Sequence, residues 1–100
     1  MVKWSIPARR DLKQIHDYIA KDSKYYAKTV IQTIVGKTEK LGDFPEIGRV
    51  VPEIDDPNIR ELFVYSYRLI YEINPEGLEI LAIVHGKRDF LSGLFHDPEL

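Results

Sequence analysis

The stretch YRLIYEINPEGLEILAIV (residues 67–84) contains two strand-like runs joined by a turn. The first run, 67–73, is rich in aromatic and branched residues. The second, 78–84, is almost wholly apolar, as expected of a central strand that is covered on both faces. Between them, Pro75 and Gly77 hold the second and fourth positions of NPEG, which favours a tight turn. The stretch therefore predicts a hairpin at the centre of a sheet.

Strict alternation along the first run sorts its side chains between the two faces of the sheet. One face receives Arg68, Ile70 and Glu72, and the other receives Tyr67, Leu69, Tyr71 and Ile73. An arginine between apolar neighbours on a central strand is costly unless it is paired or reaches the rim. Glu61 or Glu72 could pair with Arg68 in a structural ion pair. The alternative is an anion-binding patch, in which arginines fork onto phosphate or carboxylate.

The residues before this hairpin predict one more strand and an irregular connection. IRELFVY (59–65) mixes charged residues with strand formers and reads as a strand. The segment 43–58 holds three prolines and the Gly48 turn, so we expect an irregular course with a short extended piece at Val50 and Val51.

The first part of the chain predicts a strand followed by two helices. VKWSI (2–6) alternates, with Val2, Trp4 and Ile6 on one face, and predicts a short half-buried strand. Apolar residues at helical spacing predict helices over about 8–22 and 24–41. Gly42 is expected to stop the second helix. Because almost no linker separates the helices, they should form an antiparallel hairpin.

The order β-α-α-β-β-β predicts an α+β fold in which the helical hairpin packs on one face of a mainly antiparallel sheet. One domain is expected to span residues 1–100. The sequence does not reveal which strand pairs with the first one.

Composition narrows the possible functions. The chain has no cysteine, which excludes a disulfide framework and thiolate chemistry. A formal net charge of −2 means that any contact with nucleic acid must come from a local patch. No apolar run approaches the length of a membrane span or of a signal-peptide core, so the cytoplasm is the expected location.

Familiar catalytic and cofactor motifs are absent from the sequence. The three histidines have no ligand spacing, and neither HExxH nor a phosphate-binding glycine loop occurs, so we expect no metal and no cofactor. No serine stands in a G-x-S-x-G setting.

What remains is a set of cations near the predicted sheet. Arg49, Arg60 and Lys87 are candidates for binding an anion or a target. Metal-independent cleavage of RNA needs a base, an acid and cations that stabilise the charge growing on the phosphate. The residues that could fill these roles are Arg68, His85, Arg88 and, as a possible base, Glu61.

Four segments occur in an order and at separations that identify a family. They are WSIPARRDLKQIHDYIAKDS, FPEIGRVVPEI, IRELFVYSYRLIYEI and LEILAIVHGKRDF. Together they resemble the RelE/ParE superfamily of toxins from bacterial toxin–antitoxin modules, over about residues 2–90. This resemblance implies the same β-α-α-β-β-β fold, a cognate antitoxin, and inhibition of growth by the free toxin.

The superfamily divides by target. RelE-like members cleave mRNA in the ribosome, whereas ParE-like members inhibit DNA gyrase and are not nucleases. Arg68, in the Y-R-L-I-Y motif, and Arg88, in G-K-R, match arginines that stabilise phosphate in the cleaving branch, and His85 matches a histidine in some of its members. The Y-R-L-I-Y motif is also common in the gyrase-directed branch, so it does not discriminate.

Three features favour the ParE branch. The segment 43–58 contains five acidic residues against Arg49 alone, which would repel RNA. No tyrosine follows Arg88, although the cleaving branch often has one there. The long second helix and the W-S-x-x-A-x-x-D-L pattern of residues 4–12 are more like ParE relatives. We therefore expect a gyrase-directed toxin, with a ribosome-dependent mRNA endoribonuclease as the alternative and an antitoxin-binding homologue with lost or different toxicity as a third possibility.

The expected partner is common to all these readings. A chain of 100 residues has a limited interior, so part of its apolar surface should remain exposed as a groove. The resemblance implies that an antitoxin helix and extended segment fill it.

Overall fold

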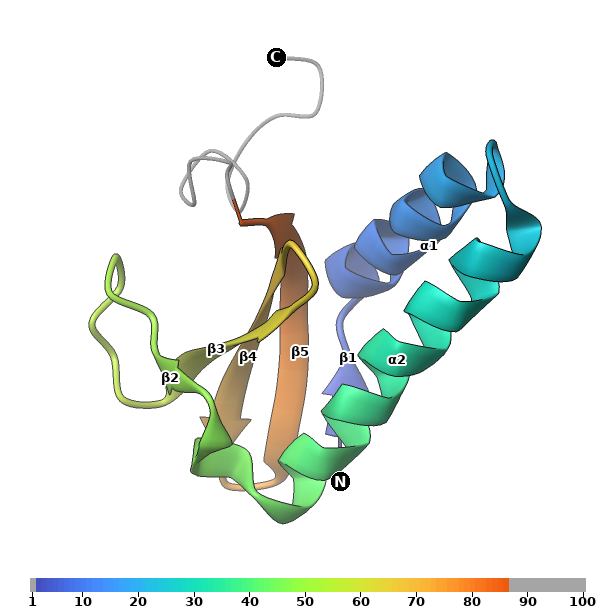
Figure 1. Cartoon of the computed structure of the whole chain (residues 1–100). Coiled ribbons are helices and arrows are strands. Elements are labelled where there is room, and N and C mark those ends of the chain that lie inside the picture. Colours follow the sequence, from blue (N-terminus) through green and yellow to red (C-terminus); the bar gives the residue numbers. More distant parts are fainter. Residues whose placement is uncertain (1, 87–100) are drawn as a thin grey trace.

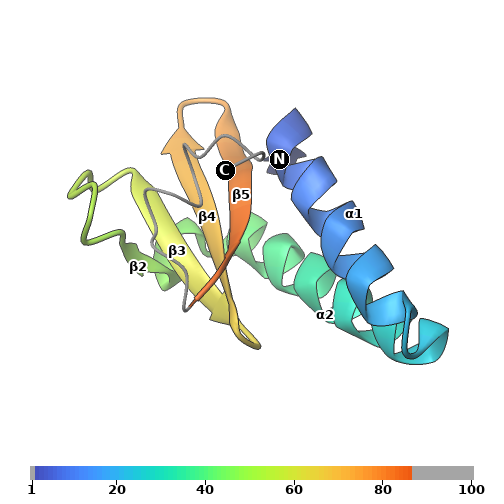
Figure 2. The same ribbon diagram turned by 90° about the horizontal axis from the view of Figure 1, so that it is seen from above.

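The computed structural model describes residues 2–86, which form two layers, a sheet and a helical hairpin (Figure 1). The elements are β1 (Val2–Trp4), α1 (Ile6–Ala20), α2 (Lys24–Asp43), the 3₁₀ turn η1 (Pro45–Ile47), β2 (Arg49–Val50), β3 (Ile59–Val64), β4 (Tyr67–Asn74) and β5 (Gly77–His85). In these residues the strands form one sheet in the order β1-β5-β4-β3-β2. The predicted α+β order is confirmed, and Figure 2 shows both helices on one side of the sheet.

The β4–β5 hairpin lies inside the sheet, as the sequence predicts. Tyr67 pairs with His85 at one end and Asn74 with Gly77 at the turn. The predicted alternation along β4 is also confirmed, because Leu69 and Tyr71 join the core under the helices while Ile70 packs on the far face. The apolar run of β5 from Ile80 to Val84 has core clusters on both sides, which explains its lack of polar alternation.

A β-bulge interrupts this pairing and changes which residues of β5 face the helices. Ile70 pairs with Ala82 but Tyr71 pairs with Ile80, so Leu81 is the extra residue. Ile80 and Ile83 consequently both join the helix-side core, although strict alternation would place residues at i and i+3 on opposite faces. The apolar run of β5 contained no signal for this shift.

The first strand pairs with β5 in parallel, with Trp4 opposite Ile80. The chain then leaves the sheet, and two side chains satisfy backbone groups of β5 beyond this point. The Ser5 hydroxyl donates to the Leu81 carbonyl (3.0 Å), and the Asp11 carboxylate accepts from the Ile83 N–H (2.9 Å). These contacts fasten α1 to the sheet.

The helix α1 begins and ends about two residues earlier than predicted, and α2 ends about two residues later. The predicted strand 2–6 ends at Trp4, and Ile6 lies in α1 with its side chain exposed. The reason is Ser5, whose side chain accepts from the Ala8 N–H and caps the helix just before Pro7. Gly42 was wrongly expected to stop α2, which continues to Asp43.

The core has two parts, one on each face of the sheet. Under the helices, apolar residues of both helices meet β3, β4 and β5, among them Ala8, Ile15, Val30, Ile34, Leu41, Leu69 and Ile80. On the far face a smaller cluster contains Val51, Ile70, Ala82 and Val84. Val51 belongs to the connection after β2, so this connection covers part of the far face. Neither α1 nor α2, the α-helices of residues 2–86, is long and apolar enough to cross a membrane.

Candidate functional site

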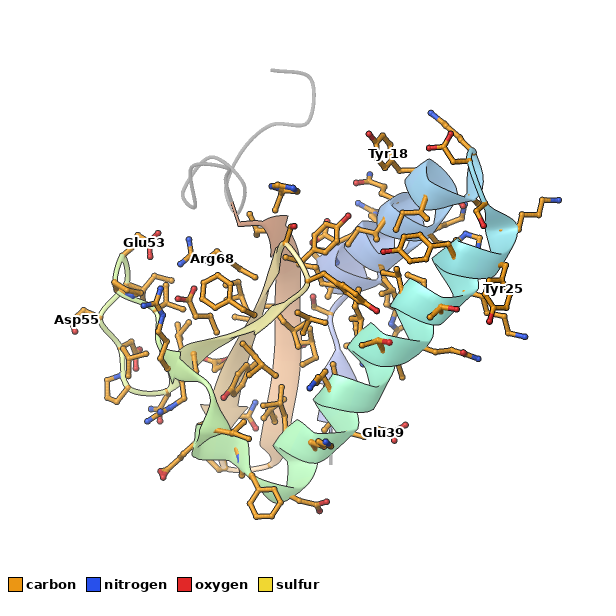
Figure 3. The ribbon with its side chains drawn as sticks, viewed as in Figure 1. Tyr18, Tyr25, Glu39, Glu53, Asp55 and Arg68 are labelled. Atoms are coloured by element: carbon orange, nitrogen blue, oxygen red, sulfur yellow. The ribbon has the colours of Figure 1, made fainter. Side chains whose placement is uncertain are left out.

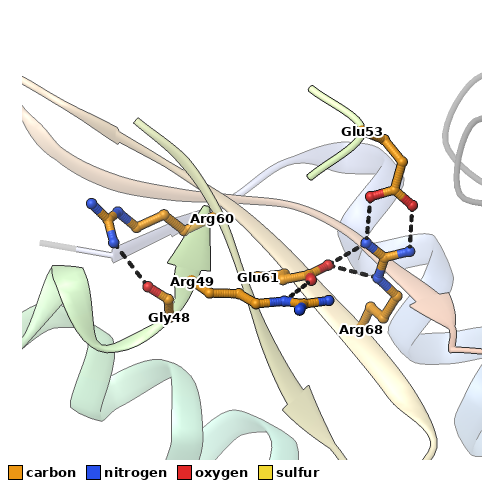
Figure 4. Close-up of polar contacts among 6 residues, drawn as sticks. All are labelled: Gly48, Arg49, Glu53, Arg60, Glu61 and Arg68. Carbon is orange, nitrogen blue, oxygen red and sulfur yellow. Dashed lines mark hydrogen bonds and ion pairs between the residues drawn. The ribbon is translucent and has the colours of Figure 1, made fainter. Parts of the chain in front are cut away.

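A chain of alternating charges crosses the far face of the sheet (Figure 4). At its centre the Arg68 guanidinium on β4 contacts the Glu61 carboxylate on β3, with Arg68 Nε donating to Glu61 Oε1 at 2.6 Å. Glu61 is fully buried and Arg68 is 8% exposed. This is the structural ion pair that the sequence allowed for Arg68, with Glu61 as its partner.

The other side of the Arg68 guanidinium is held by Glu53, from the connection between β2 and β3. Nη1 and Nη2 of Arg68 each donate to one Glu53 oxygen at 2.9 Å, which makes the pair bidentate. The hydrogen bonds from Arg68 lower the pKa of Glu53, and those to Glu53 raise the pKa of Arg68. The pair therefore fastens the connection to the sheet (Figure 3). Sequence reasoning missed Glu53, because nothing in a proline-rich segment shows which side chain folds back.

Arg49 completes the chain of charges at its outer end. Its Nε donates to Glu61 Oε2 at 2.5 Å, while its side chain stays 60% exposed. The guanidinium carbon lies 5.4 Å from the centre of the exposed Phe63 ring, a cation–π contact. Both carboxylate oxygens of the buried Glu61 thus accept hydrogen bonds from arginines. Glu61, the candidate base, therefore holds Arg49 and Arg68 in place.

The sequence analysis placed Arg60 and Arg68 in one set of cations near the sheet, but the structure places them on opposite faces. Arg60 pairs with Tyr71 across the sheet, and Tyr71 faces the helix-side core. Adjacent residues of a strand point to opposite faces, so Arg60 points away from Glu61 and Arg68. Its Nε donates to the Pro57 carbonyl (3.0 Å) and its Nη1 to the Gly48 carbonyl (2.9 Å).

His85 also lies on the opposite face from Arg68. It pairs with Tyr67 at the end of β5, and the two rings meet edge to face with their centres 5.7 Å apart. His85 lines a cavity of about 550 Å³ between the end of β5 and α1, together with Asp11 and Tyr18. The structure thus joins Glu61 to Arg68 but does not bring His85 to them. Lys87 and Arg88 lie outside the described residues.

The described residues offer no arrangement suited to a metal ion. Within 2–86, no three His, Asp or Glu side chains gather closely enough to hold one. The candidate residues in this part of the chain thus divide between the two faces of the sheet. Glu61 and Arg68 belong to an ion-pair network on the far face, whereas Arg60 and His85 lie apart from each other on the helix side.

Comparison with known proteins agrees with this fold. The sequence profile of the family described as "ParE toxin of type II toxin-antitoxin system, parDE" matches residues 2–90. Among solved structures, a chain of the "Chromosomal ParDE TA system from P. aeruginosa" is similar, with a TM-score of 0.70 and 24% sequence identity. The match covers 84% of this chain and 92% of that one, which shows a shared fold. No curated protein sequence matches significantly.

Proposed function

Because the chain belongs to the ParE toxin family of type II toxin–antitoxin systems, we propose that it arrests bacterial growth by acting on DNA gyrase. A cognate antitoxin neutralises it by forming a complex. In this proposal the protein works in the cytoplasm as a binding protein, and it needs no chemistry of its own.

The observation that supports this proposal over RNA cleavage is the engagement of Arg68. An arginine that stabilises phosphate must present its N–H groups to the substrate. Here they donate to Glu61 and Glu53, so a phosphate would have to displace a bidentate carboxylate. The exposed connection adds Asp55 next to Glu53, and this negative charge opposes an approaching RNA backbone (Figure 3).

The position of His85 also argues against the endoribonuclease alternative. A general acid or base must lie within hydrogen-bond reach of the reacting group, close to the cations that stabilise the phosphate. His85 faces α1 across a cavity, whereas Arg68 lies on the other side of the sheet.

A pair of assays on the purified chain tests the proposal. We expect micromolar protein to inhibit supercoiling of relaxed plasmid by gyrase, and the inhibition should disappear when antitoxin is added first. In bacteria in which expression of the toxin is induced, primer extension should show no new mRNA ends at ribosomal A sites. Unchanged supercoiling together with new A-site cuts would reverse the assignment in favour of the endoribonuclease.

We assign the antitoxin to the cavity between α1 and the end of β5. Two features support this choice. Tyr18 is largely exposed at its rim, and β5 has no strand beside it beyond Ile80 on the β1 side within residues 2–86. A segment of the antitoxin can therefore pack along this end of β5 with an apolar side chain in the cavity, beside the Leu81 and Ile83 backbone groups that Ser5 and Asp11 already occupy. Replacing Tyr18 with Glu should weaken the complex in a co-expression pull-down, whereas Tyr25→Glu, at the most exposed tyrosine, serves as the matched control.

A further inference from the structure

A second pocket, on the helix side of the sheet, has no role in the proposed function. It has a volume of about 710 Å³ and lies between the end of α2 with η1 and the strands β3 and β4. Its lining is mostly apolar, with a single cation, and includes Asp43, Phe44, Glu46, Ile47, Arg60 and Ile73. Pockets of this size with a few placed polar groups are typical of binding sites.

Arg60 is the one cationic residue among the described residues that line this pocket. Unlike Arg49 and Arg68, it has no ion pair with any carboxylate of residues 2–86. Its two hydrogen bonds go to neutral carbonyls, that of Pro57 and that of Gly48, the second of which is drawn in Figure 4. A guanidinium has five N–H groups, so three of those of Arg60 are left without an acceptor in this part of the chain.

The wall behind Arg60 is held in place before any ligand arrives. The Tyr71 hydroxyl donates to the Pro45 carbonyl (2.6 Å) and accepts from the Gly48 N–H (2.9 Å), and the Gly48 carbonyl in turn accepts from Arg60. A buried tyrosine thus ties together η1, the start of β2 and the arginine. Such preorganisation reduces the entropy that binding costs.

The rim of the pocket is unusual in exposing large apolar side chains. Phe44 is 65% exposed and Ile47 58%, and both line the pocket. The rim also carries Asp43 and Glu46, which oppose a polyanion such as a nucleic-acid backbone. Apolar walls beside an arginine without an ion pair suit a ligand that combines an apolar group with a single carboxylate, because these two acids repel one negative charge less than a polyanion.

We infer that this pocket docks a protein partner through a segment in which a large apolar side chain stands beside a carboxylate. The apolar side chain lies against Phe44, Ile47 and Ile73, and the carboxylate accepts from the N–H groups of Arg60. This inference does not depend on gyrase being the target.

Two small probes isolate this chemistry. N-acetyl-L-phenylalanine carries the apolar group and the carboxylate, and N-acetyl-L-phenylalaninamide differs only in lacking the charge. With the full-length protein, both should shift the NMR methyl resonances of Ile47 and Ile73, and only the acid should shift the Arg60 Nε–H resonance. We expect the acid to bind about tenfold more tightly than the amide, because its hydrogen bonds to Arg60 are charge-assisted.

Three variants separate the contributions. Arg60→Gln should remove the preference for the acid, and Ile47→Ser should weaken both probes equally. Glu46→Gln should tighten the acid by several-fold, because it removes a negative charge from the rim. Ile47 and Glu46 are exposed, so these two variants remain informative even if Arg60→Gln loosens the wall.

Several results would overturn the inference. Equal affinity for acid and amide would remove the role of Arg60. Shifts confined to Tyr67 and His85 would place binding in the other cavity. If the same methyl resonances move with protein concentration alone, the occupant is a second copy of the chain, and if duplex DNA displaces the acid, the pocket is a polyanion site.

Discussion

The guanidinium of Arg68 contacts the carboxylate of Glu61 across two neighbouring strands, and both side chains are almost completely buried. Their backbone positions are not directly opposite, because Arg68 pairs with Phe63 and Glu61 with Ile70. The contact is therefore diagonal on the far face, within reach of these long side chains. Removing one member of such a pair leaves the other charge buried with less compensation, which costs more than the pair contributes.

Arg68→Met should lower the free energy of unfolding by about 3 kcal/mol. This is the low end of the range for a broken buried pair, because Arg49 still contacts Glu61. Urea denaturation measures the loss. Arg68→Met/Glu61→Leu should recover most of it, since a buried pair can be replaced by apolar side chains of similar volume. The control Arg49→Leu removes an exposed partner of the same carboxylate and should cost about 1 kcal/mol or less.

The same variants separate a structural role of Arg68 from contact with a substrate. If Arg68 only supports the fold, toxicity lost in Arg68→Met should return in the double variant along with stability. Toxicity that stays lost in a stable double variant would assign Arg68 a direct part in function.

The sequence predicted the structure where polar and apolar residues alternate or turn residues stand, and failed where a strand is apolar on both faces or very short. Alternation along β4 and the NPEG turn predicted the central hairpin, because each residue faces a defined side. The bulge at Leu81 was not predictable, since β5 is apolar on both faces and a shift of one residue leaves its pattern unchanged. The pairing of β1 could not be read from a strand of only three residues.

The site shows the same division. The sequence named Glu61 and Glu72 as partners for Arg68, and only the register selects Glu61. Alternation already implied that Arg60 and Glu61 point to opposite faces, so a shared patch of Arg60 and Arg68 was excluded once that pair formed. The contact of Glu53 with Arg68 could not be predicted from the sequence, because the position of Glu53 depends on how the connection between β2 and β3 folds over Ile70 and Val84.

The bidentate pair of Glu53 and Arg68 should make stability depend on pH. The pKa of Glu53 is lowered in the folded protein from an ordinary value of 4.5. Its contribution is therefore fully present above about pH 4.5 and is lost as the pH falls through the lowered folded pKa. Because Glu53 is 36% exposed, solvent screening limits this contribution to about 1 kcal/mol.

Glu53→Gln provides the measurement. At pH 7 the variant should be less stable than the wild type by about that amount, and the two unfolding free energies should converge towards pH 3. Curves that remain parallel from pH 7 to pH 3 would contradict the assigned role of Glu53.

The Tyr71 hydroxyl holds the wall that carries Arg60, so Tyr71→Phe tests its importance. The side chain is fully buried, and its burial raises the pKa of the phenol. The variant leaves the Gly48 N–H and the Pro45 carbonyl without their partner, which should cost about 1–3 kcal/mol. Tyr65→Phe is the matched control, because its exposed hydroxyl makes only a 3.3 Å contact with Thr33. Equal thermal stability of the two variants would refute this role.

Two glycines differ in the space around them and predict opposite effects of alanine. A Cβ at Gly48 would lie 2.5 Å from the Tyr71 hydroxyl and 2.6 Å from the Glu61 carbonyl oxygen, whereas a Cβ at Gly36 would meet no atom within 4 Å. Gly48→Ala must push the strand away from Tyr71, and we expect a loss of about 1–3 kcal/mol. Gly36→Ala, on the exposed surface of α2, should add about 1 kcal/mol through helix propensity. Chemical denaturation of both variants measures these changes. A neutral Gly48→Ala would mean that β2 can separate from β3 without cost, and the wall of the Arg60 pocket would then not be rigid.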